Sequence, residues 1–199
     1  MYRLAVLVSG NGSNLQAILD ACAGGELAAE VAVVVSNVAD AYGLERAKGA
    51  GVATVVLERT PGEARDRYDA RLRDAVAAYE PDLVVLAGWM RILTPVFVEA
   101  FDVINLHPAL PGELPGTHSI ERAWQEALAG QRTGSGVMVH RVPGAGVDDG
   151  PVLASEAVAI RLDDTFDAFA ARIHATEHRL LVGAIRDLIH PPVTQGAEA

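Results

Sequence analysis

Cysteine is nearly absent from this chain of 199 residues, in which Cys22 is the single one. One cysteine excludes an internal disulfide framework and suits a reducing compartment. Long apolar runs are lacking too. After Arg3 only five apolar residues follow, up to Val8, which is too short for a signal peptide or a membrane span. We therefore expect a soluble, cytoplasmic protein with no membrane partner.

Basic residues are scarce relative to acidic ones, with 16 Lys and Arg against 26 Asp and Glu and a formal net charge of −10. This balance argues against nonspecific nucleic-acid binding, so a phosphorylated ligand has to be held by local donors. Half of the residues are hydrophobic and 21% are charged, as in a globular protein. The sequence predicts one domain over residues 1–190 and a disordered tail over residues 191–199.

Apolar runs of strand length alternate with helical patterns in the first half. The expected strands are residues 4–8, 31–35, 54–57, 83–87 and 103–106, and the expected helices are residues 15–23, 43–48, 64–79 and 95–100. The strand segments are almost continuously apolar, which is typical of strands covered on both faces. This alternation predicts an α/β fold with a doubly wound, mostly parallel sheet flanked by helices.

The second half has a different pattern. A loop over residues 108–116 precedes a helix near residues 120–129. Two runs, residues 136–142 and 151–160, flank a Pro-Gly turn and predict antiparallel strands added to the sheet. A final helix, capped by Asp164 or Thr165, is expected to extend to about Ile189 and to end before Pro191 and Pro192.

Asn105 and His107 are the first candidates for chemistry, with Asp148 as a third. Side chains alternate along a strand, so Asn105 and His107 point to the same face. A carboxamide beside a titratable ring suits stabilising an oxyanion while moving a proton. Each residue also has a structural interpretation: Asp148 can be an Asx-turn residue with Asp149 as its competitor. If Asp148 meets His107, we expect the carboxylate to raise the imidazole pKa.

A glycine-containing loop, residues 9–14, directly follows the first expected strand. Gly10 and Gly12 allow close backbone approach, and the next helix points free N–H groups and its positive dipole end at the loop. This arrangement predicts a phosphate site. The spacing matches neither GxGxxG nor a Walker A loop. The alternative is a simple glycine turn in which Ser13 or Asn14 caps the helix.

An apolar segment follows the fourth expected strand. Its large side chains would line a slot suited to a flat heteroaromatic ligand, or would simply pack in the core; they are Trp89, Met90, Ile92 and Leu93. Arg65 and Arg91 can pair with carboxylates or stay solvated.

The last helix carries His174, Glu177 and His178 at spacings that share one face. The pattern HxxEH resembles an inverted zinc motif, but a third ligand is not evident, so we expect no metal. A plain surface cluster and hydrogen bonding to a sugar or amine are the two remaining interpretations.

Taken together, segments along residues 3–188 resemble the phosphoribosylglycinamide formyltransferases, folate-dependent enzymes of purine synthesis. The segments are residues 7–16, 35–37, 86–93, 105–108 and 146–151. Asn-x-His-Pro with a later Val-Asp-x-Gly-Pro marks the wider formyl-transfer superfamily, and the Ser-Gly-Asn-Gly-Ser-Asn loop points to this family. Residues 109–116 depart from its pattern, with a displaced proline and with Glu113 where a basic residue is common; Trp89 replaces the more usual Phe or Tyr.

The resemblance implies a Rossmann-like formyltransferase fold and transfer of a formyl group from 10-formyltetrahydrofolate to the amine of glycinamide ribonucleotide. Gly12, Ser13 and Asn14 would hold the ribonucleotide phosphate, and His174 and Glu177 would contact the same substrate. By the same resemblance the folate would be held by Arg65, Met90, Arg91, Ile92, Leu93, Asn105, Gly144, Ala145, Gly146, Val147 and Asp148. The protein would act on small molecules as a monomer or homodimer, without metal or nucleic acid.

The catalytic residues implied by the resemblance are Asn105, His107 and Asp148. The amine attacks the formyl carbon, and Asn105 with a protonated His107 donates hydrogen bonds to the formyl oxygen. Asp148 helps to carry the proton from the amine to the departing folate nitrogen. This route needs no covalent intermediate, in agreement with the position of Cys22 away from the motifs.

Three alternatives compete with this interpretation. A methionyl-tRNA formyltransferase would need a further C-terminal nucleic-acid-binding domain and a more basic surface. A formyltetrahydrofolate deformylase would carry an N-terminal regulatory domain, whereas the expected sheet begins here near residue 3. A binding module without catalysis would retain all function when Asn105 or His107 is removed.

Overall fold

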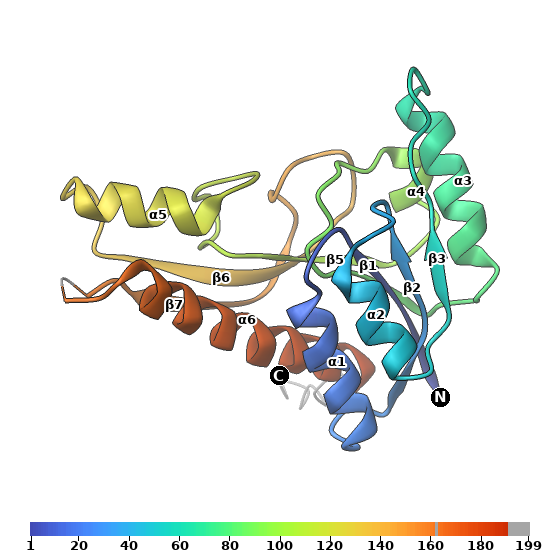
Figure 1. Ribbon diagram of the computed structural model, residues 1–199, viewed down its shortest axis with the longest axis horizontal. Helices are drawn as coiled ribbons and strands as arrows, with labels where there is room; N and C mark the ends of the chain where they lie inside the picture. The colour runs from blue at the N-terminus through green and yellow to red at the C-terminus, as the bar shows by residue number, and fades with distance from the viewer. Residues whose placement is uncertain (162, 191–199) are drawn as a thin grey trace, which may run out of the picture.

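The computed structural model, which describes residues 1–161 and 163–190, contains a seven-stranded sheet in the order β3-β2-β1-β4-β5-β6-β7 (Figure 1). The strands are β1 (Tyr2–Val8), β2 (Ala29–Ser36), β3 (Thr54–Val56), β4 (Leu83–Leu86), β5 (Val103–His107), β6 (Gly134–Arg141) and β7 (Val152–Ala159). The helices are α1 (Ser13–Ala23), α2 (Tyr42–Gly49), α3 (Arg65–Ala77), α4 (Pro95–Val98), α5 (Ser119–Leu128) and α6 (Phe166–Ile189).

Strands β1 to β5 are all parallel, and the apolar segments of β1, β2, β4 and β5 are largely buried on both faces, whereas the edge strand β3 is only partly buried. One core lies between the sheet and α1, α2, α5 and α6, with Leu15, Leu44 and Phe169 among its members. The other lies between the sheet and α3 and α4, with Tyr68 and Phe97 fully buried. Helices therefore cover both faces, and the predicted doubly wound α/β sheet is confirmed.

Strands β6 and β7 extend the sheet in the antiparallel sense, as predicted. The pairing of β5 with β6 places Asn105 opposite His140 and His107 opposite Met138. The β6–β7 hairpin brings residues 142–151 back over the end of β5 (Figure 1). This register matters for function because it sets which side chains of β6 approach Asn105.

Element boundaries differ from the predicted ones by at most two residues. For the last helix, Thr165 rather than Asp164 is the cap: its hydroxyl accepts a hydrogen bond from the N–H of Ala168 at 3.2 Å. Asp164 instead pairs with Arg172. The predicted disordered tail lies outside the described residues. In the part of the chain that the structure describes, no helix has the length and apolar character needed to cross a membrane.

Candidate active site

The candidate site lies at the carboxyl ends of the parallel strands. The chain runs from β1 outward to β3 and then returns to β4 on the other side of β1, so ligand-binding loops are expected to meet between β1 and β4. Ser9, after β1, joins the loops there. Its hydroxyl accepts a hydrogen bond from the Met90 N–H at 2.8 Å and donates one to Asn37 Oδ1 at 2.6 Å. The glycine loop and the apolar segment are thus held side by side.

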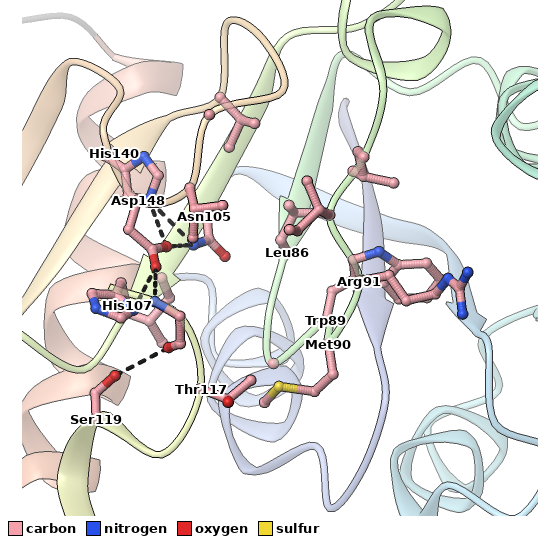
Figure 2. Close-up of a pocket in the computed structure, with 18 of the residues that line it drawn as sticks. Leu86, Trp89, Met90, Arg91, Asn105, His107, Thr117, Ser119, His140 and Asp148 are labelled. Carbon is pink, nitrogen blue, oxygen red and sulfur yellow. Dashed lines mark hydrogen bonds and ion pairs between the residues drawn. The ribbon is translucent and has the colours of Figure 1, made fainter. Parts of the chain in front are cut away.

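Asn105 and His107 point to the same side of β5, and both reach the carboxylate of Asp148 (Figure 2). Asn105 Nδ2 donates to Asp148 Oδ1 at 3.0 Å, and His107 Nδ1 lies 3.3 Å from Asp148 Oδ2. The His107 side chain is 4% exposed and that of Asp148 10%. Residues up to 43 positions apart along the chain therefore form one buried polar cluster.

His140 is a fourth member of this cluster, and the sequence analysis missed it. Its Nε2 lies 3.1 Å from Asn105 Nδ2 and 3.5 Å from Asp148 Oδ1. Its Nδ1 faces the carbonyl oxygen of Arg141 at 2.8 Å and therefore carries the proton of a neutral ring. His140 Nε2 then accepts from Asn105, which fixes the orientation of that carboxamide. The only sequence signal is a histidine in an apolar β6 strand, which gains meaning once the register is known.

Asp148 occupies the left-handed region, with φ of 53°, which turns its side chain toward β5. The Gly116 N–H donates to its Oδ2 at 2.9 Å. Burial works to raise the pKa of Asp148, but its interaction with the His140 ring, the hydrogen bond from the Gly116 N–H and the nearby His107 imidazole outweigh it and lower the pKa. Asp148 is therefore an ionised carboxylate at neutral pH.

His107 differs from the expectation. Burial lowers its pKa below the usual value, although Asp148 and the carbonyl groups of Leu114 and Glu113 act in the opposite direction. Asp148 thus acts on the imidazole pKa in the predicted direction, but desolvation is the larger effect, so the net pKa is lowered. The Leu114 carbonyl, 3.1 Å from Nε2, selects Nε2 as the protonated nitrogen of the neutral ring.

A cavity of about 440 Å³ opens beside this cluster. Figure 2 shows the polar cluster on one side of it and Leu86, Trp89, Met90 and Arg91 on the other. The residues predicted for folate that line the cavity are Met90, Arg91, Ile92, Leu93, Asn105, Gly144, Gly146, Val147 and Asp148; Arg65 and Ala145 are not among the lining residues. Lining residues that were not predicted include Thr117, His118, Ser119 and His140.

The apolar segment lines the cavity with both buried and exposed residues. Trp89 and Leu93 are buried in the core with α3 and α4, whereas Met90 is 65% exposed and Ile92 49%. The guanidinium of Arg91 stacks on the Tyr68 ring at 4.6 Å, and Arg65 donates to the Ile92 carbonyl at 3.0 Å. Two cations thus lie next to an exposed apolar surface at the rim.

In the glycine loop, a glycine and not a side chain occupies the cap position of α1. Gly12 is the N-cap with φ of 74°, and no side chain caps the helix, so capping by Ser13 or Asn14 is not observed. Asn14 Oδ1 is buried and has no hydrogen-bond partner within the described residues. Arg46 of α2 holds the loop by donating to the Asn11 carbonyl at 2.9 Å and to Asn11 Oδ1 at 3.0 Å.

Gly12→Ala is expected to destabilise the fold by about 1–3 kcal/mol, because alanine would have to adopt a left-handed conformation. Its Cβ would also lie 2.7 Å from the Gly43 Cα, a backbone atom that cannot move freely. Urea unfolding measures the change in the free energy of unfolding. Gly10→Ala is the matched control, since nothing lies within 4 Å of that Cβ. Equal stability of the two variants would contradict this account of Gly12.

Within the α6 cluster, His174 and Glu177 form a hydrogen-bonded pair, so the cluster is not a loose group of surface side chains. His174 Nδ1 lies 2.7 Å from Glu177 Oε2, and Glu177 is only 5% exposed. This hydrogen bond raises the pKa of His174, whereas burial lowers the pKa of His178. Arg46, which holds the glycine loop, is close enough to His178 to act on its charge. Among the described residues, no group of three or more potential ligands is placed to hold a metal ion.

Comparison with known proteins agrees with the resemblance seen in the sequence. The formyl transferase family matches residues 2–185. The phosphoribosylglycinamide formyltransferase of Schizosaccharomyces pombe is 46% identical over 200 residues, which cover 94% of this chain and 96% of that protein. The one from Escherichia coli strain K12 is 42% identical over 179 residues, covering 89% of this chain and 82% of that protein.

Solved structures agree with the sequence relatives. Glycinamide ribonucleotide transformylase 1 from Symbiobacterium toebii superposes with a TM-score of 0.87 at 42% identity, covering 94% of this chain and 87% of that one. Phosphoribosylglycinamide formyltransferase from Bacillus halodurans gives 0.87 at 32% identity, covering 95% and 96%. The resemblance seen in the sequence is confirmed, and this chain belongs to the formyl transferase family.

Proposed function

We propose that this protein transfers a formyl group from 10-formyltetrahydrofolate to the amine of glycinamide ribonucleotide, a step of purine synthesis. One observation carries the proposal: in a chain of this family, Asn105 and His107 share the Asp148 carboxylate at the wall of a cavity large enough for a heteroaromatic ring. The sequence relatives named phosphoribosylglycinamide formyltransferase align with nearly the whole chain.

The cavity suits the folate donor. A flat pterin fits beside Leu86, Met90 and Ile92, and polar groups converge on it from the turn before Asp148. Arg65 and Arg91, near the rim, are placed to attract the carboxylates of a folate tail. A chain with a net charge of −10 needs such local cations to hold an anion.

The glycine loop suits the phosphate of the acceptor. Gly12, Ser13 and Asn14 present backbone N–H groups and a dipole end at the start of α1, where no side chain takes the capping position. His174 and Glu177 lie on α6, which packs against α1, and Glu177 is a buried carboxylate suited to an amine or hydroxyl. We propose that these five residues hold the ribonucleotide.

The chemical step begins when the substrate amine attacks the formyl carbon and negative charge grows on the formyl oxygen. Asn105 is the proposed donor to this oxygen. Its two N–H groups face Asp148 and His140, so donation requires one of these bonds to be exchanged for the formyl oxygen. His140 Nε2, a neutral acceptor, is the weaker partner and the one we expect to be released.

His107 then handles the proton. Because its pKa is lowered, the resting ring is neutral and can take up the proton that the amine loses. The new proton goes to Nδ1, where Asp148 stabilises the imidazolium. The C–N bond to the folate breaks as the proton passes to the departing nitrogen, so the formyl group moves without a covalent enzyme intermediate. In this mechanism His107 is neutral before the reaction, whereas the resemblance implies a His107 that is already protonated.

The dependence of kcat/KM on pH follows from this assignment. A protonated His107 cannot accept the amine proton, so activity is expected to fall below its pKa, which lies under 6.5. The substrate amine titrates separately, near about 8. The profile should therefore show two steps on the acid side, and only the lower one should move in Asp148→Asn. A loss of activity as the pH rises from about 6 to 7.5 would contradict a neutral resting His107.

Formyl transfer by the purified protein tests the function, with the released folate followed by absorbance. Three acceptors are compared, which show how much each part of the ribonucleotide contributes to binding: glycinamide ribonucleotide, its riboside without the phosphate, and glycinamide. We expect turnover with the ribonucleotide and a large rise in KM for the other two, because they lack the phosphate held by the glycine loop. Equal KM values would remove the proposed role of Gly12, Ser13 and Asn14.

A further inference from the structure

The loop over residues 112–118 crosses directly over the polar cluster and is held in a costly conformation. Leu114 has φ of 45° and His118 has φ of 59°, both left-handed values that side chains rarely adopt. Such conformations persist only where the surroundings impose them. The question is what holds this loop.

Arg132, just before β6, is the main anchor. Its side chain is 16% exposed and is held between the carboxylates of Glu113 and Glu126. It also donates to the carbonyl oxygen of Gly134, the first residue of β6, at 3.2 Å. The planar guanidinium can meet two carboxylates and a carbonyl at once, which a lysine ammonium cannot match. Arg132 therefore fixes Glu113 of the loop to the sheet.

Leu114, the residue after Glu113, makes the loop's contact with the polar cluster. The Leu114 carbonyl faces His107 Nε2 at 3.1 Å and also accepts from the Ser119 hydroxyl at 3.0 Å. Two residues further on, the Gly116 N–H donates to Asp148 Oδ2 at 2.9 Å. The loop thus sets the tautomer of His107 and orients the carboxylate beside it.

We propose that the Arg132–Glu113 ion pair is a positioning pair for His107: by fixing Glu113 it holds the Leu114 carbonyl against Nε2. Neither side chain touches the reacting atoms. Loss of the pair frees the loop, weakens the acceptor at Nε2 and leaves the imidazolium less stabilised. The effect on catalysis rests on the proposed function; the effect on the ring itself does not.

The direct test is an NMR titration of the His107 ring in the protein without substrates, comparing wild type with Glu113→Gln and Arg132→Met. The titratable side chains that act on His107 are Asp148 and His140, and both are unchanged in these variants. We expect the His107 pKa to fall by about 0.5 to 1 pH unit, the scale of one weakened hydrogen bond. The double variant should show no further fall, because both changes break the same contact.

Glu30→Gln is the matched control. Glu30 pairs with Arg3 at a similar exposure, 44% against 38% for Glu113, but lies at the start of β2, at the opposite end of the sheet. It should leave the His107 titration and kcat unchanged. If Arg132→Met fails to fold, Arg132→Lys keeps the charge but serves only one carboxylate, and an intermediate fall is expected.

In the formyl-transfer assay, kcat of Glu113→Gln should fall about fivefold to tenfold, and the lower pH step should move with the His107 pKa. Variants that lose thermal stability while His107 titrates as in wild type would overturn the proposal and make the pair purely structural. A wild-type protein without formyl-transfer activity would remove the proposed function, yet the titration would still decide whether the pair positions His107.

Discussion

Asn105→Ala is expected to lower kcat by about 10²–10³ with the fold intact, the usual cost of removing one donor to a developing oxyanion. The carboxamide bridges Asp148 and His140, and it is the one group of the cluster proposed to donate to the formyl oxygen. Its loss removes the hydrogen bond to the formyl oxygen and leaves Asp148 with one partner fewer. KM for both substrates should change little, because neither is bound chiefly through this group.

Steady-state kinetics of formyl transfer measure this change, and equilibrium binding of a folate analogue measures ligand retention. The two together separate an enzyme from a binding module. An Asn105→Ala variant that binds the analogue and turns over within about threefold of wild type would contradict the oxyanion role, since the smallest effect expected of such a donor is far larger.

Asp148→Asn is expected to lower kcat by about 10²–10⁴, the range of general acid–base contributions. Asparagine has the same shape and tolerates the left-handed conformation seen at this position, with φ of 53°, so the backbone should not change. What is lost is the negative charge beside His107 Nδ1 at 3.3 Å. The imidazolium formed in the reaction then has no counter-charge, and the pKa of His107 falls further.

Asp149→Asn supplies the matched control, because it removes one carboxylate from the neighbouring, exposed position. It should retain full activity. This comparison also decides between two adjacent aspartates that sequence reasoning alone left as competitors. Loss of activity in Asp149→Asn with full activity in Asp148→Asn would reverse the assignment.

The sheet was predictable because its physics is local. Buried parallel strands are continuously apolar, as in β1 and β4. The helices between them are recognised from the residue patterns of their own segments. The same holds for Asn105 and His107, since strand alternation alone places them on one face. Their meeting with Asp148 required the resemblance or the structure, because separations of 43 and 41 residues carry no distance information.

The roles of His140 and of the loop over residues 112–118 could not be predicted from the sequence for a different reason. His140 acquires its role from the pairing of Asn105 with His140 across β5 and β6, and nothing in either strand specifies that register. The net lowering of the His107 pKa was not predicted, because it depends on the degree of burial, which outweighs the effect of Asp148 and is not visible in the sequence.

A single-turnover experiment tests the central claim most directly. Protein in excess over 10-formyltetrahydrofolate carrying a labelled formyl group is mixed with glycinamide ribonucleotide, and folate release and labelled product are followed together. Direct transfer at the Asn105–His107–Asp148 cluster predicts that both appear at one rate in wild type and that both slow equally in Asp148→Asn. Folate release ahead of labelled product, or an unchanged rate in Asp148→Asn, would contradict it.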